Sequence, residues 1–370
     1  MKFTLQQQTF MQRAIELAWK GFGKTQPNPL VGAVVVKNGK IVGDGYHQKL
    51  GGAHAEVNAL KMAGSKAHGA DLYVTLDPCY HTGRTGPCTE VVKKYGIRNV
   101  FSAMSDPHDP RHEGEKILKR AGIQFQRGLL ADVSREALQF YLKNVEKSLP
   151  YVILKVATTM DGKVATASGF SRGITSQDSL KFTHTLRSQA DGVLTGGGTL
   201  AMDNPHMGVR YAKGKDPVRI LLDSDLDVTM SSDFFRDNHV IVFTTKKASS
   251  GKIRELKKRG IEVVILDSLS DLSVILRMLF ERKIYILMIE AGHHIMTSFV
   301  QGGFVDQYIQ LIAPKLLGGV NSPTSFEGPD FTDYSKMKIV KDLSVSQLGP
   351  DILLKGYLSW YGYISYNLGN

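Results

Sequence analysis

The sequence contains only two cysteines among its 370 residues. So few cysteines exclude the disulfide-dense scaffolds typical of small secreted proteins. No apolar run approaches the roughly 20 residues that a membrane-spanning helix needs, and no extended Pro-, Gly- or Ser-rich tract indicates disorder. The N-terminal segment carries Gln and Glu where a signal peptide has an apolar core. Together these absences predict a soluble, cytoplasmic protein with no membrane partner.

Two features of the sequence are informative, its length and its positive net charge. At roughly 100–200 residues per domain, a chain of 370 residues predicts two or three domains. The formal net charge of +11 suggests phosphorylated small molecules or nucleic acid as partners, although charge says nothing about the fold. Both classes of partner remain open at this point.

The first 150 residues alternate between helix and strand patterns. Apolar residues at helical spacing predict a helix over residues 5–19, and an Asn-Gly turn predicts a hairpin between residues 31–37 and 40–47. The remaining segments are predicted as a helix at about 54–62, a strand at 71–76, a helix from 87 or 88 to 96, a strand at 99–104, a short helix at 115–122 and a helix at 131–147. This alternation favours a layered α/β fold.

A second series of strands and helices follows a break near residues 148–150. It begins with a strand pattern at 151–160, and a helix is predicted from the N-cap residue Ser176 to Ser188. Further strands are predicted at 191–195, 217–223, 239–243, 262–265 and 283–289. The predicted domains are therefore residues 1–147 and 150–370.

Both cysteines fall in one short segment, as Cys79 and Cys88, and His54 and Glu56 lie upstream. Catalytic zinc sites use three nitrogen or sulfur ligands and leave the fourth position to water. His54, Cys79 and Cys88 supply such a set, with Cys79 at the end of a strand and Cys88 at the start of a helix. Glu56 could then carry a proton between the zinc-bound water and a substrate amine without binding the metal. The sequence therefore predicts one catalytic zinc ion per chain.

Zinc-dependent nucleobase deaminases have the pattern His-x-Glu followed by Pro-Cys-x-x-Cys. The first half of this pattern and Pro78-Cys79 match, but eight residues separate the two cysteines instead of two. Three alternatives remain open on this pattern. They are a structural zinc closed by His47 or His81, a single-activity nucleobase deaminase acting on tRNA or DNA, and a binding protein with a structural zinc. The last has no use for Glu56, because a closed zinc shell needs no proton carrier.

A glycine run at residues 192–201 follows a predicted strand. Gly196, Gly198 and Ala201, with Asp223 about twenty residues on, formally fit the dinucleotide-binding fingerprint of a Rossmann fold. A glycine triplet is weak support by itself, because turns and close packing also require glycine.

Several segments resemble the bifunctional deaminase-reductases of bacterial riboflavin biosynthesis. They are PNPLVGAVVV (27–36), GYH (45–47), HAE (54–56), PCYHTGRTGPC (78–88), LKVATTMDGKVAT (154–166), DGVLTGGGTLAMDNP (191–205), RILLDS (219–224), IEAG (289–292) and LIAPKLLGG (311–319). The resemblance covers nearly the whole chain and includes the eight-residue cysteine spacer. It implies an N-terminal cytidine-deaminase-like three-layer α/β/α domain. It also implies a C-terminal dihydrofolate-reductase-like α/β domain, which we prefer to a Rossmann fold.

The resemblance implies two reactions on a phosphoribosylated pyrimidine. Zinc-dependent hydrolysis removes the exocyclic amine of a diaminopyrimidinone, and NADPH then reduces the ribosyl group to a ribityl chain. Nucleic acid is no longer an expected partner, and a homo-oligomer is expected from the resemblance alone.

The family's substrate positions fall on residues of both halves. In the deaminase they are Asn28, His47, His81 and Arg84. An Asn side chain can pair with a base edge as donor and acceptor, and the guanidinium of Arg84 suits a phosphate. In the reductase they are Ser171, Arg187, Met207, Arg210 and Glu290. Lys155 and Glu290 would polarise or protonate the ribose.

The family's NADPH positions also map onto this chain. Among them, the turn from Gly292 to Ser298 precedes a helix, and its backbone amides would hold a phosphate. They are Ala157, Gly173, Thr199, Asp203, Ser224, Gly292, His293, His294, Ile295, Met296, Thr297 and Ser298. The chain departs from the family pattern at Gly173, where members commonly have a bulky aromatic, and at Met207-Gly208, where they have Leu-Thr. It also has Asp77 in place of Glu and Gly86-Pro87 in place of a double proline.

Overall fold

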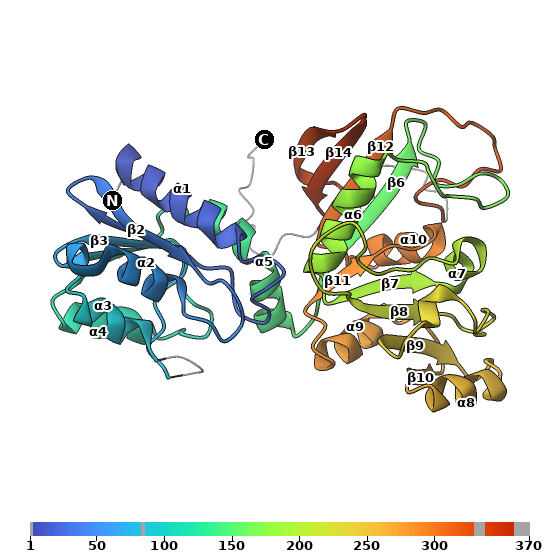
Figure 1. The fold of residues 1–370 in the computed structure, drawn as a ribbon, viewed down its shortest axis with the longest axis horizontal. Coiled ribbons are helices and arrows are strands. Elements are labelled where there is room, and N and C mark those ends of the chain that lie inside the picture. Colours follow the sequence, from blue (N-terminus) through green and yellow to red (C-terminus); the bar gives the residue numbers. More distant parts are fainter. Residues whose placement is uncertain (1–2, 83–85, 329–336, 359–370) are drawn as a thin grey trace. The chain divides into compact units, whose positions relative to one another are not determined.

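The computed structural model describes residues 3–82, 86–328 and 337–358. These residues form two compact units, and the chain passes from the first to the second between Lys147 and Ser148 (Figure 1). No described helix is both long and apolar enough to cross a membrane.

The first unit contains a mixed sheet with the strand order β2-β1-β3-β4-β5. The strands are β1 (Gly32–Lys37), β2 (Lys40–Tyr46), β3 (Asp71–Val74), β4 (Asn99–Ser102) and β5 (Gln124–Arg127). Strand β1 is antiparallel to both β2 and β3, whereas β3, β4 and β5 run parallel. The predicted hairpin is confirmed, and both residues of its Asn38-Gly39 turn have positive φ.

Helices cover both faces of this sheet. They are α1 (Leu5–Trp19), α2 (Ala55–Ala63), the 3₁₀ turn Gly64–Ala67, α3 (Cys88–Lys94), α4 (Glu113–Arg120) and α5 (Ala131–Lys147). Leu72 and Val74 of β3 belong to the same buried cluster as Leu60 of α2. Tyr73 points to the opposite face, where its ring lies 5.3 Å from that of Phe10 in α1. The unit therefore has three layers, α/β/α.

The second unit has a sheet with the order β10-β9-β8-β7-β11-β6-β12-β14-β13. The strands from β10 to β12 run parallel, and β14 and β13 extend the sheet in antiparallel fashion. Their bounds are β6 (Tyr151–Thr159), β7 (Gly192–Gly196), β8 (Val218–Leu222), β9 (Val240–Thr245), β10 (Glu262–Leu266), β11 (Ile286–Ile289), β12 (Gln307–Ala313), β13 (Lys341–Leu348) and β14 (Asp351–Tyr357).

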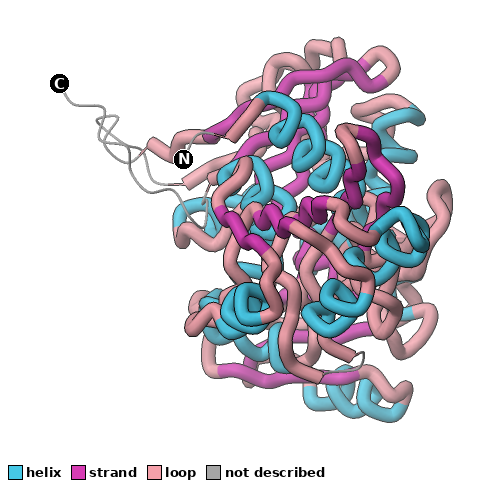
Figure 2. The backbone as a smooth tube through the Cα atoms, turned by 90° about the vertical axis from the view of Figure 1, so that its left-hand side faces the viewer, coloured by secondary structure: helices cyan, strands magenta, loops and turns pink. Residues whose placement is uncertain are grey.

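Helices also lie on both faces of this sheet. Figure 2 distinguishes the helices, strands and loops of the chain by colour. They are α6 (Gln177–Gln189), α7 (Gly197–Asp203), the 3₁₀ turn Asp233–Phe235, α8 (Ser250–Lys258), α9 (Leu272–Glu281) and α10 (His293–Gln301). Leu194 of β7 packs in one buried cluster with residues of α9 and α10. Its neighbour Val193 packs in another cluster, with Leu256 of α8. Burial on both faces explains why these parallel strands are almost wholly apolar.

The strand order answers the question raised by the glycine run after β7. In a Rossmann sheet the fourth strand returns to lie beside the first, in the order 3-2-1-4. Here β8 and β9 follow outward from β7 and β11 lies on its other side, as in that order. The next place, however, is taken by β6, which precedes β7 in the sequence, and β14 and β13 continue the sheet in antiparallel fashion. The sheet as a whole therefore departs from the 3-2-1-4-5-6 order of a Rossmann fold.

Most predicted elements are present, with differences at their ends. Helix α1 matches the predicted range, and Ser176 is the N-cap of α6, its side chain accepting a hydrogen bond from the Ser179 N–H. Strand β3 ends at Val74 instead of residue 76, although irregular pairing continues as the Asp77 N–H donates to the Met104 carbonyl. Strands β5, β12, β13 and β14 had no counterpart among the predictions.

Candidate active sites

The three predicted zinc ligands come together in the first unit. His54 is the N-cap residue of α2, Cys88 is the first residue of α3, and Cys79 lies in the loop after β3. The His54 Nδ1 atom is 3.2 Å from Cys88 Sγ and 3.5 Å from Cys79 Sγ. All three ligand atoms lie within 4.8 Å of one another. The prediction that Cys79 ends a strand is wrong, because β3 stops at Val74 and the chain turns before Cys79.

The donor set fits a zinc ion. Zinc–sulfur bonds of about 2.3 Å and zinc–nitrogen bonds of about 2.0 Å in a tetrahedron place the ligand atoms roughly 3.5–3.8 Å apart, close to the distances found here. Hydrogen bonding from the Cys88 thiol, opposed by burial, lowers the pKa of Cys79 to about 4. The same bond and burial raise the pKa of Cys88. Without a metal the two sulfurs thus share one proton, and a metal held by both thiolates would displace it.

Glu56 lies in the first turn of α2 and is only 3% exposed. Burial raises the pKa of its carboxyl to about 7, and the nearby Cys79 thiolate contributes to the increase. A carboxyl group that titrates near neutral pH can both accept and donate a proton during turnover.

Two of the predicted pyrimidine contacts adjoin this cluster. Asn28 Nδ2 is 3.1 Å from Nε2 of His47, and Nδ1 of His47 is 3.1 Å from the Ala53 carbonyl oxygen. The ring of His47 meets that of His54 edge-on, with the centroids 5.4 Å apart. Because both nitrogens of His47 already have partners, neither is left to close a zinc shell.

The other two predicted contacts belong to the loop between the cysteines. His81 is exposed, lies edge-on to Tyr80 and is not part of the ligand cluster found among the described residues. Arg84 lies outside the described residues.

An ion-pair cluster behind the Cys79 loop was not predicted from the sequence. The Arg127 guanidinium donates to Asp77 Oδ2 from Nε at 3.0 Å and from Nη2 at 2.7 Å, and it also reaches Glu115 at 2.7 Å. Asp77 is buried two residues before Cys79, so the cluster fixes the start of the ligand loop. Arg127 is 50 residues away in the sequence, and nothing in its own segment marks it.

A second group of charged residues meets in the second unit. Arg187 of α6 donates to both carboxylate oxygens of Glu290, at 2.6 and 3.1 Å. Lys155 Nζ of β6 lies 3.4 Å from Glu290 Oε2. Glu290 directly follows β11, which ends at the same residue as the strand predicted at 283–289. Glu290 therefore contacts two other predicted site residues, Arg187 and Lys155.

The pKa values of Glu290 and Lys155 shift in ways that give these two residues different protonation behaviour. Burial alone would raise the pKa of Glu290, but Arg187 and Lys155 together hold it at about 2. Burial also lowers the pKa of Lys155, although Glu290 opposes that change. Glu290 is therefore ionised, whereas Lys155 releases its proton more readily than an exposed lysine.

The predicted cofactor residues gather where β7 and β11 end. A methyl group on Gly292, the N-cap of α10, would lie 3.8 Å from Thr199 Oγ1, and one on Gly196 would lie 2.6 Å from Ile295 Cδ1. No side chain caps the N-terminus of α10, and space is open around Gly198. Because β7 and β11 are adjacent parallel strands, the turns after them meet at one edge of the sheet.

The remaining predicted positions are spread around this edge. Asp203 accepts a hydrogen bond from Ser171 Oγ at 2.6 Å, and its buried Oδ1 has no partner among the described residues. An unpaired buried acceptor beside open glycine turns fits a hydrogen-bonding cofactor such as NADPH. His293 pairs with Glu327, and Met296 belongs to the buried core. The other predicted positions differ in exposure: two are partly buried, Ala157 and Thr297, and four are exposed, Gly173, Ser224, His294 and Ser298.

Met207 and Arg210 lie in an irregular segment after α7. Met207 is buried, and its Sδ is 3.7 Å from Nη2 of Arg187. Arg210 is exposed, and its guanidinium lies over the Tyr211 ring at 5.6 Å.

Comparison with known families assigns each unit. Residues 4–104 match the cytidine and deoxycytidylate deaminase zinc-binding region, and residues 150–354 match the RibD C-terminal domain. The predicted cytidine-deaminase-like and dihydrofolate-reductase-like fold classes are thereby confirmed.

Individual relatives match over almost their full length. The riboflavin biosynthesis protein RibD of Aquifex aeolicus is 42% identical, covering 93% of this chain and 96% of its own, and that of Bacillus amyloliquefaciens is 40% identical, covering 93% and 94%. The solved structure of Acinetobacter baumannii RibD superposes with a TM-score of 0.83 at 36% identity, covering 96% of this chain and 99% of that one. A Thermotoga maritima diaminohydroxyphosphoribosylaminopyrimidine deaminase and 5-amino-6-(5-phosphoribosylamino)uracil reductase gives 0.79 at 33% identity, with the same coverage. The chain therefore belongs to the RibD family of bifunctional riboflavin biosynthesis proteins.

Proposed function

We propose that this chain catalyses the two successive reactions that are named for its Thermotoga maritima relative. Residues 1–147 would deaminate the phosphoribosylated diaminopyrimidinone, and residues 150–370 would reduce the ribosyl side chain of the aminouracil product with NADPH. The observation that carries the proposal is the His54, Cys79 and Cys88 cluster beside the buried Glu56. It has three ligands and a proton carrier, which is the composition of a catalytic and not of a structural zinc site.

In the deaminase, His54, Cys79 and Cys88 would hold the zinc ion. A bound zinc ion supplies a water molecule acidic enough to attack at neutral pH. Glu56 accepts a proton from that water and delivers it to the departing amine, which leaves as ammonia. Asn28 and His47 orient the pyrimidine edge, while His81 and Arg84 contact the substrate from the loop between the cysteines.

In the reductase, the turn from Gly292 to Ser298 would hold NADPH together with Ala157, Gly173, Thr199, Asp203 and Ser224. Bound NADPH supplies the hydride that reduces the first carbon of the ribosyl group. Lys155 donates the accompanying proton, because Glu290 is ionised by its contacts with Arg187 and Lys155. Glu290 orients these two cations, Arg187 and Arg210 bind the phosphate, and Ser171 and Met207 complete the substrate pocket.

A single-activity nucleobase deaminase is disfavoured. It would leave the whole second unit without a role, and the spacing between the cysteines differs from that of the enzymes that act on nucleic acid. Binding of RNA with a steep salt dependence would reverse this preference.

A coupled assay with the phosphoribosylated diaminopyrimidinone tests the proposal. We expect release of ammonia first, followed by NADPH oxidation that depends on the deaminated product. Consumption of NADPH without any pyrimidine would contradict it. Metal analysis should find about one zinc per chain, and Cys88→Ser should lose most of it.

Location and assembly complete the proposal. The reactions use small water-soluble metabolites, so we place the enzyme in the cytoplasm. From its family resemblance we also expect a homo-oligomer. Cell fractionation and light scattering of the purified chain test these two points.

A further inference from the structure

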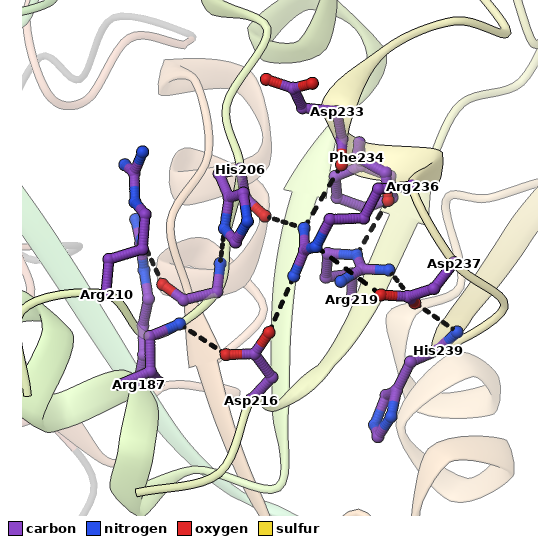
Figure 3. A network of polar contacts seen from close by, with 12 residues as sticks. Arg187, His206, Arg210, Asp216, Arg219, Asp233, Phe234, Arg236, Asp237 and His239 are labelled. Atoms are coloured by element: carbon purple, nitrogen blue, oxygen red, sulfur yellow. Dashed lines mark hydrogen bonds and ion pairs between the residues drawn. The ribbon is translucent and has the colours of Figure 1, made fainter. Parts of the chain in front are cut away.

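The segment after α7 that carries Arg210 is irregular, yet side chains fix its backbone; we call residues 206–210 the 206–210 loop. On one side Arg236 donates to the His206 carbonyl at 2.6 Å and to Asp216 Oδ2 at 2.8 Å. Asp216 Oδ1 in turn accepts the Val209 N–H at 2.7 Å. Figure 3 shows Arg236 between His206 and Asp216. Arg236 and Asp216 therefore hold the loop at two points.

Helix α6 holds the loop from the other side. Nδ1 of His184 accepts the N–H of Arg210 at 2.9 Å, and Nη1 of Arg187 donates to the Gly208 carbonyl at 3.1 Å. His184 and Arg187 are three residues apart, so they lie on the same face of the helix. The face that presents Arg187 to Glu290 thus also fixes the backbone of Arg210.

The loop has little freedom to rearrange. Met207 has a positive φ of 52°, which an L-residue adopts only when its surroundings impose it. A methyl group on Gly208 would lie 2.7 Å from Asp216 Oδ2 and 2.8 Å from Arg236 Nη2. Arg236 and Asp216 occupy the space that a side chain at position 208 would need.

His184 has the properties of a positioning group. It is fully buried, and burial, followed by Arg187 and Arg210, lowers its pKa to about 4. The neutral ring accepts through Nδ1, and its Nε2 has no partner among the described residues. Its bond to the Arg210 N–H is therefore the one hydrogen bond that the described residues offer to its ring.

We propose that His184 and Asp216 are positioning residues that hold the 206–210 loop so that Arg210, beside Arg187, meets the phosphate of the reductase substrate. The inference rests on the proposed function. Holding the loop before substrate arrives removes the cost of ordering it on binding. The effect should therefore appear in substrate affinity and only weakly in kcat.

A pair of variants at one position tests this role. In His184→Asn the amide oxygen can replace Nδ1 as acceptor, whereas His184→Leu has similar bulk and no acceptor. We expect His184→Leu to raise the reductase KM for the phosphorylated aminouracil about tenfold with kcat within twofold, and His184→Asn to stay within about threefold. The KM for NADPH and the deaminase rate should not change, so the deaminase rate reports the amount of folded enzyme.

Asp216→Ala provides a second, independent test. It should give the same rise in KM, because it releases the Val209 N–H and one arm of Arg236. Asp227→Ala is the matched control, since Asp227 is 97% exposed, and it should leave the KM unchanged.

Ribose 5-phosphate and unphosphorylated ribose separate this inference from the proposed function. Calorimetry should show ribose 5-phosphate bound about tenfold more weakly by His184→Leu than by the parent, with no such difference for ribose. An active parent whose KM and phosphate binding are unchanged in both His184→Leu and Asp216→Ala would overturn the inference alone. A parent that binds ribose 5-phosphate in this way but never oxidises NADPH would overturn the proposed function and leave the positioning role standing.

Discussion

Glu56 shows how one residue acquires its chemistry from its position. It lies in the first turn of α2, two residues after the N-cap residue His54, so the same helix start places both beside the cysteines. Burial, not a specific hydrogen bond, is the main cause of its raised pKa. The carboxyl is therefore poised for proton transfer by the packing around it.

At the residue scale, Glu56→Gln removes the proton carrier and keeps the size of the side chain. We expect ammonia release to fall by about 10²–10⁴-fold, because general acid–base catalysis contributes that much. Zinc content should be unchanged, since Glu56 is not a ligand. Stopped assays for ammonia and metal analysis provide the two measurements. Glu90→Gln on the exposed surface of α3 is the control, and an unaltered rate in Glu56→Gln would remove the proton-transfer role.

At the scale of elements, α2 packs directly on the backbone of β2. A methyl group on Gly43 would lie 2.3 Å from the Ala59 carbonyl oxygen and 2.7 Å from the Ala63 nitrogen. A flexible side chain can change its conformation to avoid such a clash, whereas the backbone atoms of a helix cannot. The distance between α2 and the sheet, and with it the position of His54, therefore depends on this glycine.

Gly43→Ala should lower the free energy of unfolding of the first unit by about 1–3 kcal/mol or more, as overpacking does. It should also weaken zinc retention, because α2 must shift. Urea unfolding with parallel metal analysis measures both effects. Gly86→Ala is the matched control in the same unit, because nothing lies within 4 Å of the added methyl. Equal stability of the two variants would refute the close-packing argument.

Asp191 connects two elements of the second unit. Its Oδ2 accepts the N–H groups of Tyr285 at 3.0 Å and Ile286 at 2.9 Å, at the start of β11. Burial raises its pKa to about 6 despite these bonds. The folded state therefore binds the proton more tightly than the unfolded state. The stability that this proton contributes is complete below about pH 4 and is lost as the pH rises through about 6.

Asp191→Asn keeps the accepting oxygen but cannot ionise. The variant should therefore be more stable than the parent above pH 6, by about 2–3 kcal/mol, and the difference should shrink towards pH 4. Urea unfolding at several pH values measures it. In Asp227→Asn, where the side chain is exposed, the difference from the parent should not depend on pH. A constant offset between Asp191→Asn and the parent would show that Asp191 does not ionise in this range.

At the scale of the molecule, each unit has its own sheet and its own buried clusters. The proposed catalytic groups of each reaction lie wholly within one unit. Each reaction therefore depends on groups that a single unit supplies.

We predict that the two activities can be separated and recombined. Glu56→Gln should reduce the aminouracil at the parental rate within about twofold, and Lys155→Met should still release ammonia at the parental rate. A mixture of the two variants should carry the diaminopyrimidinone through both steps, as followed by ammonia and NADPH. Loss of both activities in either single variant would contradict this independence.

The motifs were sufficient to predict that His54, Cys79 and Cys88 come together, and the apolar runs were sufficient to predict most of the parallel strands. His-x-Glu and the two cysteines are local signals whose chemistry is set by residue type, and the apolar strands are marked by burial on both faces. Strands such as β13 were not predicted, because nearly all of its residues are exposed and no apolar periodicity marks them.

The sequence by itself determined which side chains are available: His and Cys that can bind a metal, Glu that can transfer a proton, and Arg that can bind phosphate, once they are suitably placed. Only the tertiary structure decided which of them act together. It buried Glu56, paired Asp77 with Arg127, joined Lys155 to Arg187 and Glu290, and set His184 against the backbone of Arg210. The physical reason is that these contacts join residues up to 135 positions apart, and no local pattern records a contact that only the packing of strands and helices creates.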